Sequence, residues 1–248
     1  MDRLIYIAMA GAQQALHQQA VTAHNLANTS TPGYKSDTAA FRVAPVVGPG
    51  MPTRAYALAT IAGTNLTAGP LQRTGSDLDV AIQGDGFLAV QTPDGNEAYT
   101  RNGSLQLSSE GVLQTNGGLT VLGTGGPITV PPDSKLAIGS DGTISLTTNG
   151  QSAANVTVVG QLKLVNPARA DIVKGSDGLF RTRDGQPADA AEGVTVVAGA
   201  LEASNASAVS TMVEMIGLAR QFDLQMKMLQ NAETDSQHAT QLLTTTPA

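Results

Sequence analysis

The sequence predicts a mainly β protein with α-helices at its two ends. We expect a multi-stranded, all-β central domain flanked by N- and C-terminal helices that pair in coiled-coil fashion. At both ends apolar residues recur at steps of three or four, the period of a helix, whereas between Leu78 and Ala200 the period is two. In that central part short apolar runs are separated by Asp-Gly and Asn-Gly pairs, which are typical of tight hairpins.

Changes of composition along the 248 residues divide the chain into four segments. Residues 1–34 hold the first helix and its exit turn, and residues 35–76, which are rich in Pro and Gly, are expected to form an extended linker or hairpin region. The all-β domain is expected at 77–200 and the second helix at 201–248. A chain of this length is large enough for one large or two small domains.

The first helix carries one narrow apolar stripe, whose large members are Ile5, Met9 and Leu16, while glutamines occupy much of the remaining surface. Pro32 ends the helix because it lacks an N–H and disfavours helical dihedrals in the residue before it. Gly33 then permits the positive φ of an exit turn. A stripe of this kind most often packs inside its own domain, but its place at the end of the chain argues for a partner helix.

The opening LIYIAMAGAQQA superficially resembles a signal peptide. Its apolar part is too short for one and continues directly into an amphipathic helix, so we expect this segment to be retained. No apolar run reaches the roughly 20 residues needed to span a bilayer. The sequence therefore predicts no direct insertion into a membrane.

The Asp-Gly pairs of the central part invite a calcium-binding or phosphate-binding interpretation. No stretch fits the D-x-[DN]-x-[DN]-G loop of calcium sites, and GDGF and GTGG lack the context of phosphate loops. The triplets GDG, PDG, RNG, SEG and NGG follow one another in the first part of the domain. We therefore interpret them as hairpin turns.

The second helix begins near Asn205, and either Asn205 or Ser207 is a suitable N-cap. The spacing of its apolar residues is close to that of a coiled-coil seam, which needs a partner helix to bury it. Its methionines provide an adaptable filling against neighbours that are not equivalent in position. The expected seam includes Val209, Met212, Ile216, Phe222, Met226 and Leu229.

Charge and residue types argue against several functions. Only 14% of residues are charged, against about 25% in an ordinary soluble domain, which suits a surface covered by neighbours. The net charge of −6 and the scattered basic residues predict no binding of nucleic acid. With no cysteine, three histidines confined to the terminal helices and no G-x-S-x-G motif, we expect no catalytic residue, no metal and no cofactor. One alternative stays open, because Asp77, Asp79 and Asp85 would supply the carboxylate pair of a glycan-cleaving enzyme on a β scaffold.

Three blocks of sequence resemble those of the bacterial flagellar rod and hook proteins. NLANTSTPGYK (Asn25–Lys35) resembles their N-terminal signature, and DLDVAIQGDGFLAV (Asp77–Val90) their central motif. LEASNASAV (Leu201–Val209), followed by MIGLARQFDLQMKML, resembles their closing helix. The blocks span nearly the whole chain, and their joint order is highly specific. Departures from the family pattern conserve volume or charge and stand at Leu88, Ala206, Ala219 and Asp223.

This resemblance implies a structural protein with the flagellar rod and hook type of fold. Such subunits are exported unfolded through the flagellar type III apparatus without a cleaved signal, and they stack helically into the hollow shaft that crosses the periplasm and carries torque from motor to hook. The terminal helices are expected to line the inner tube, with the β domain outside. Expected partners are copies of this chain, other rod proteins and the export apparatus.

Within the family, the opening residues, the length and the AYTRNGSLQL segment most resemble the proximal-rod members. A distal-rod or hook-type subunit is the nearest alternative. A β-scaffold enzyme acting on cell-wall glycan and a soluble adhesin are the alternatives from other functional classes.

We expect the assembly interface to include the two apolar stripes and the residues where the chain leaves the tube. Asn25 and Asn28 would bond to the backbone of a neighbouring subunit and fix one register, because an unsatisfied buried amide costs on the order of 1 to 3 kcal/mol. The simpler alternative is that both residues cap the helix end. The expected interface comprises Ile5, Met9, Leu16, Asn25, Leu26, Asn28, Gly33, Tyr34, Leu201, Asn205, Val209, Met212, Ile216, Phe222, Met226 and Leu229.

Overall fold

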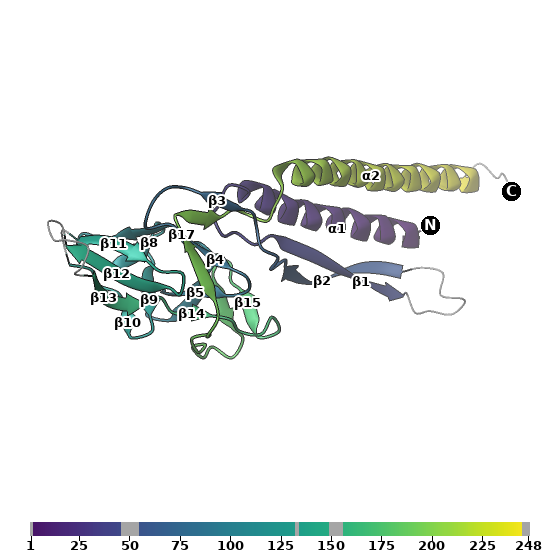
Figure 1. Cartoon of the computed structure of the whole chain (residues 1–248). Helices are drawn as coiled ribbons and strands as arrows, with labels where there is room; N and C mark the ends of the chain where they lie inside the picture. Colours follow the sequence, from purple (N-terminus) through teal and green to yellow (C-terminus); the bar gives the residue numbers. More distant parts are fainter. Residues whose placement is uncertain (1, 46–54, 132–133, 149–155, 245–248) are drawn as a thin grey trace. The chain divides into compact units, whose positions relative to one another are not determined.

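The computed structural model describes residues 2–45, 55–131, 134–148 and 156–244 (Figure 1). The chain divides into two units, each built from segments that are far apart in sequence. The helical unit comprises Met1–Asn28, Ser36–Asn65 and Ala206–Ala248, and the β unit comprises Thr29–Lys35 and Leu66–Asn205. The predicted fold class, mainly β with packed terminal helices, is confirmed.

The helical unit contains α1 (Asp2–Ala27) and α2 (Ala208–Thr244), which lie side by side with the chain termini at the same end (Figure 1). A hairpin of β1 (Asp37–Pro45) and β2 (Ala55–Thr64) contacts α1. This hairpin lies within the segment for which the sequence predicts an extended linker or hairpin. Its contact with α1 makes it part of the helical unit.

The two helices meet along small residues of α1 and a heptad-spaced face of α2. Alanines dominate the buried positions of α1, so the helix backbones can approach closely. At Gly11 an added Cβ would lie 2.9 Å from the side chain of Gln225 on α2. Buried or half-buried α2 positions alternate at steps of four and three, as in a coiled-coil seam. The positions are Ala8, Ala12, Ala15 and Thr22 on α1, and Thr211, Met215, Leu218, Phe222, Gln225, Leu229 and Ala232 on α2.

Ser207 is the N-cap of α2. The backbone N–H of Ser210 donates to the Ser207 hydroxyl at 3.4 Å, and the N–H of Thr211 donates to the Ser207 carbonyl at 2.9 Å. The sequence suggested Asn205 or Ser207 as the N-cap, and the structure shows that it is Ser207. Asn205 is engaged elsewhere, in the β unit.

The β unit consists of antiparallel strands in several sheets. The main sheet has nine strands in the order β15-β16-β6-β5-β9-β8-β7, with β10 paired to β9 and β14 to β5. A second sheet has the order β11-β12-β13, and β17-β4 and β18-β3 form separate pairs. The bounds are β3 Leu71–Arg73, β4 Val80–Gln83, β5 Phe87–Gln91, β6 Glu97–Thr100, β7 Leu105–Leu107, β8 Leu113–Thr115, β9 Thr120–Gly123, β10 Gly126–Pro127, β11 Ser134–Ile138, β12 Thr143–Thr148, β13 Val156–Gln161, β14 Leu164–Val165, β15 Ile172–Lys174, β16 Phe180–Thr182, β17 Thr195–Ala198 and β18 Ala200–Glu202.

Strand β5 is buried on both faces. Leu88 and Val90 point into the larger apolar cluster, while Phe87 and Ala89 point into a second cluster with Tyr99. Successive side chains of a strand alternate between its faces, so β5 separates the two clusters. This explains why its sequence is continuously apolar.

The glycine triplets serve two different purposes. Gly95 has a φ of 83°, as the predicted hairpin turn at PDG requires. Gly103 of RNG, by contrast, is not among the positive-φ glycines; a Cβ there would lie 1.7 Å from the carbonyl oxygen of Val80. The prediction of a positive-φ hairpin turn at RNG is therefore wrong, because Gly103 is required for close approach of the backbone to β4.

Candidate functional site at the junction of the terminal motifs

Three charged side chains form a buried ion cluster inside the β unit. The Nζ of Lys35 lies 2.5 Å from Oε1 of Glu202, and Nη1 of Arg101 lies 2.8 Å from Oε2 of the same carboxylate. All three side chains are at most 2% exposed. Because one carboxylate faces two cations, both of its oxygens are engaged and the cluster carries a net positive charge.

Backbone groups complete the hydrogen bonding of the cluster. The N–H of Gly69 donates to Oε1 of Glu202 at 2.8 Å, and Nζ of Lys35 donates to the carbonyl of Thr67 at 2.8 Å. Buried charges are tolerated when they are paired and when their remaining valences are hydrogen-bonded. The loop that precedes β3 supplies these groups to Lys35 and Glu202.

Arg101 is held by two carbonyls as well as by the carboxylate. Its guanidinium donates to the carbonyls of Ile82 at 3.3 Å and Gly84 at 2.6 Å. The Arg101 Cζ also lies 5.5 Å from the ring centroid of Phe87. The cluster therefore ties the end of β4 and the start of β5 to the residues that precede α2.

Burial lowers the pKa of Lys35, and the hydrogen bond and charge of Glu202 oppose this shift. Desolvation is the larger effect because almost no part of the side chain reaches solvent. Glu202 provides the largest contribution that opposes the desolvation of the ammonium. The carboxylate is thus the central group of the site.

The Gly33-Tyr34-Lys35 end of the N-terminal motif is inserted into the β unit. Gly33 has a φ of 69°, and its N–H donates to the carbonyl of Glu202 at 2.7 Å. A Cβ at Gly33 would lie 2.2 Å from the backbone carbon of Arg101, so only glycine fits. The side chain of Tyr34 is buried, with Nζ of Lys174 lying 4.1 Å from its ring centroid.

The start of the closing motif lies against the same segment. The N–H of Asn205 donates to the carbonyl of Tyr34 at 3.3 Å, and its side-chain amide donates to the carbonyl of Thr67 at 3.0 Å. Leu201 is half-buried in β18. Gly33, Tyr34, Leu201 and Asn205, all expected at the assembly interface, are therefore brought together within one chain.

Asn25 and Asn28 both make hydrogen bonds within the helical unit. The Asn25 amide donates to the carbonyl of Asp37 at 2.8 Å and accepts from the N–H of Asp37 at 2.8 Å, a two-bond clamp on the start of β1. The Asn28 amide donates to the carbonyl of His24 at 2.9 Å, which is a bond that caps the end of α1. These bonds are compatible with a further bond to a neighbouring subunit, which stays a prediction, and Leu26 between the two residues is half-buried.

Large members of the predicted apolar stripes remain exposed in the helical unit. On α1, Leu16 is 50% exposed and Met9 is also exposed, while Ile5 is half-buried. On α2, Val209 is 74% and Ile216 56% exposed. Met212 and Met226 of α2 are exposed too, and Phe222 and Leu229 are half-buried against α1. Exposed apolar patches of this kind mark surfaces that other molecules cover.

Three family models match the chain, at the positions of the three resembling blocks. The model "Flagella basal body rod protein" matches residues 5–35, "Flagellar hook protein FlgE/F/G D1 domain" residues 81–146, and "Flagellar basal body rod FlgEFG protein C-terminal" residues 197–242. The flagellar basal-body rod protein FlgF of Escherichia coli strain K12 is 46% identical over 98% of this chain and 99% of the relative. The chain belongs to the FlgF-like family of flagellar basal-body rod proteins.

Other members of the rod protein family are similar over the same length. FlgF of Salmonella typhimurium strain LT2 is 44% identical over 98% of this chain and 99% of the relative. The rod protein FlgG of Bacillus subtilis strain 168 is 30% identical over 94% of this chain and 96% of the relative. The chain is accordingly a structural subunit of the bacterial flagellar basal-body rod, and neither the distal-rod alternative nor the glycan-cleaving enzyme is favoured.

The described residues contain neither a metal-binding cluster nor a membrane-spanning helix. No group of three His, Cys, Asp or Glu side chains suited to a metal ion occurs among them. No helix in the described ranges is long and apolar enough to cross a membrane. Asp85, one of the carboxylates considered for glycan cleavage, lies 3.5 Å from Arg169 in an exposed ion pair.

Sequence patterns alone did not indicate the Lys35–Arg101–Glu202 cluster. Lys35 and Glu202 lie in the N-terminal and closing family motifs, and Arg101 lies in the AYTRNGSLQL segment, whose RNG triplet was expected to form a turn. In a chain with so few charged residues, a charge inside an otherwise uncharged motif was the available indication. Nothing in one sequence shows that these three positions meet.

Proposed function

We propose that the chain occupies the proximal part of the rod and packs against sister molecules through the exposed stripes of α1 and α2. These helices would line the inner tube of the hollow shaft, with the β unit outside, and the assembled shaft would carry torque from motor to hook. The proposal is carried by one observation: the apolar side chains of Leu16, Val209 and Ile216 are exposed in this chain, which belongs to a family of rod subunits. Placing these side chains against another subunit would remove apolar surface from water, worth about 25 cal/mol per Å².

In this proposal the buried ion cluster couples the β unit to the chain segments that enter and leave it. Lys35 belongs to the segment that follows α1, and Glu202 to the strand that precedes α2. Glu202 binds Lys35 through one carboxylate oxygen and Arg101 through the other, so both crossing points are fixed relative to the core. A force applied to the β unit would then reach the helices through a fixed pair of connections.

We further propose that the chain passes through the flagellar type III export apparatus, keeps its N-terminal helix and lies in the part of the rod that crosses the periplasm. Its partners would be copies of itself and other rod proteins. The proposed role needs no catalysis, no cofactor and no nucleic acid. Mass spectrometry of the N-terminus in purified basal bodies tests the retained helix directly.

Leu16→Gln and Ile216→Gln test the helix interface. Both side chains are at least half exposed, so we expect the isolated subunit to keep its circular dichroism spectrum and unfolding midpoint while rod assembly and motility are lost. Val158→Gln on β13 is the matched control, because Val158 is 63% exposed but lies in the β unit. Normal rods in cells that carry both helix substitutions would overturn the proposed interface.

A further inference from the structure

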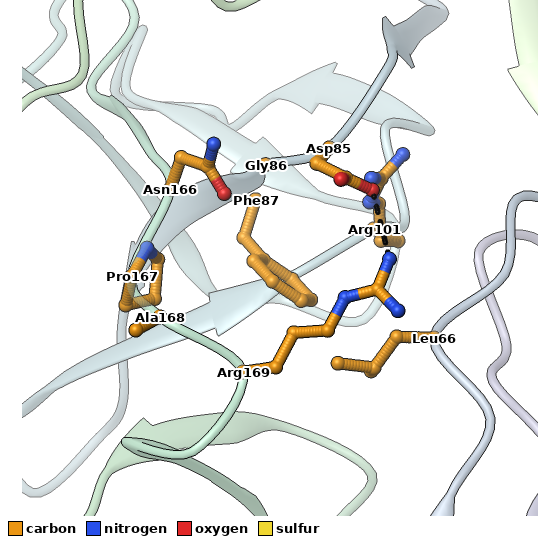
Figure 2. A pocket seen from close by; sticks show the side chains of 9 residues that line it. All are labelled: Leu66, Asp85, Gly86, Phe87, Arg101, Asn166, Pro167, Ala168 and Arg169. Carbon is orange, nitrogen blue, oxygen red and sulfur yellow. Dashed lines mark hydrogen bonds and ion pairs between the residues drawn. The ribbon is translucent and has the colours of Figure 1, made fainter.

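A pocket of about 230 Å³ opens in the β unit beside the ion cluster (Figure 2). Figure 2 shows the ring of Phe87 in the middle of the lining residues, with Pro167 and Arg169 from the loop that follows β14. Leu66 adds another apolar contact surface. The volume corresponds to about eight waters at roughly 30 Å³ each, which is enough for a short side chain that ends in a polar group.

Two guanidinium groups line this pocket. Arg101 is almost fully buried, and its two terminal nitrogens are engaged by Glu202 and backbone carbonyls, but its buried Nε–H has no hydrogen-bond partner among the residues that the structure describes. A buried charged donor without an acceptor is an unfavourable arrangement that an added acceptor would relieve. The pocket therefore favours a ligand group that accepts hydrogen bonds and carries negative charge.

The second guanidinium already attracts a carboxylate. Arg169 donates to Oδ1 of Asp85 at 3.5 Å, and both side chains are 67% exposed. A long, exposed pair of this kind contributes little, so another carboxylate can replace Asp85 at small cost. Arg169 and Asp85 can separate without disturbing the buried residues beneath them.

We propose that this pocket receives the carboxylate of an Asp or Glu side chain from a second copy of this chain. One carboxylate oxygen accepts from Arg169 and the other from the Nε–H of Arg101, while Phe87, Leu66 and Pro167 cover the aliphatic stem. A second copy fits because the chain has 20 acidic against 14 basic residues, so its surface offers carboxylates to a cationic pocket. The inference rests on the proposed function in one respect: it takes the molecule that supplies the carboxylate to be another subunit of the assembly.

The chemistry of the pocket is tested with propionate as the probe and propionamide as its uncharged analogue. In the full chain labelled with ¹⁵N, propionate should shift the Nε–H resonances of Arg101 and Arg169, and propionamide should not. Arg169→Gln should weaken propionate binding about two- to five-fold, the range of an exposed charge pair. Asp85→Asn should strengthen it by a similar factor, because it removes the internal competitor. Absence of any propionate shift overturns the site.

The source of the carboxylate is tested by self-association in sedimentation velocity. Arg169→Gln should raise, and Asp85→Asn should lower, the concentration at which the chain associates. Arg181→Gln, which removes an exposed arginine outside the pocket, is the control and should change nothing. A propionate response without any effect on association would overturn the second copy as the source. The helix variant Ile216→Gln separates the two proposals. If Ile216→Gln leaves association unchanged while Arg169→Gln and Asp85→Asn alter it, the proposed helix interface is refuted and the proposed pocket is supported.

Discussion

Replacing Glu202 by Gln should destabilise the β unit more than any other single change from acid to amide in this chain. The substitution keeps the shape of the side chain but leaves the buried cations Lys35 and Arg101 without a counter-ion. Breaking a buried ion pair by neutralising one partner costs about 3 to 5 kcal/mol. Domains are stable by only about 5 to 15 kcal/mol, so this is a large fraction of the total. The corresponding fall in Tm is about 6 to 20 °C at 2 to 4 °C per kcal/mol.

Urea unfolding and calorimetry of the full chain measure this loss, and two further variants make the comparison specific. Asp177→Asn removes a carboxylate that lies 2.6 Å from Arg181 but is partly exposed, so it should cost no more than about 1 kcal/mol. Lys35→Met leaves Glu202 paired with Arg101 and should therefore cost less than Glu202→Gln. If Glu202→Gln is as mild as Asp177→Asn, or if Lys35→Met is the more damaging of the two cluster variants, the electrostatic reasoning is refuted.

Three other expectations follow from single contacts. Gly33→Ala should destabilise the chain by several kcal/mol, and Gly75→Ala by only about 1 kcal/mol in the same urea titration, because both have positive φ but only Gly33 has backbone atoms within 3 Å of an added Cβ. Asn25→Ala should speed amide hydrogen exchange at Asp37, since it removes the two bonds by which Asn25 holds the backbone of that residue; unchanged exchange would contradict the clamp. Burial raises the pKa of Tyr99 from 10.0 to about 12, so absorbance titration should show a phenol that ionises well above the ordinary range of tyrosine. The stability that this neutral phenol contributes is present below pH 10.0 and is lost as the pH rises through about 12, and a Tyr99→Phe variant should lack that loss.

The periodicity of the sequence predicted the helices and the change to strands. Of the large apolar residues that it placed in the seam of α2, Phe222 and Leu229 lie in the contact between the helices, whereas Val209, Met212, Ile216 and Met226 are exposed. The seam of α1 is made by Ala8, Ala12 and Ala15, whereas the larger apolar residues Met9 and Leu16 stay exposed. Small side chains carry a weak apolar pattern, yet they allow the close approach that Gly11 also reflects. A hydrophobic pattern shows which residues avoid water, and it does not distinguish burial within a chain from burial between chains.

The ion cluster was beyond prediction for a different reason. Each member has an ordinary local explanation: Lys35 ends a motif, Arg101 follows strand β6 and Glu202 ends strand β18. Their meeting depends on the pairing of β18 with β3 and on the insertion of the segment after α1, which are long-range events. Strand β3 lies outside the 77–200 range expected for the β domain and strand β18 extends two residues beyond it, because only their pairing makes either of them part of a sheet.

The sequence separation of the cluster has a kinetic consequence. Lys35 and Glu202 are 167 positions apart, so a chain that emerges progressively from a ribosome or a channel cannot form their contact until most of its length is free. Closing so long a loop is slow compared with forming the local hairpins between them. The hairpins between Lys35 and Glu202 can therefore form early, whereas Lys35 cannot form its ion pair until Glu202 has emerged. The Lys35–Glu202 contact thus forms late in folding, only after nearly the whole polypeptide has emerged.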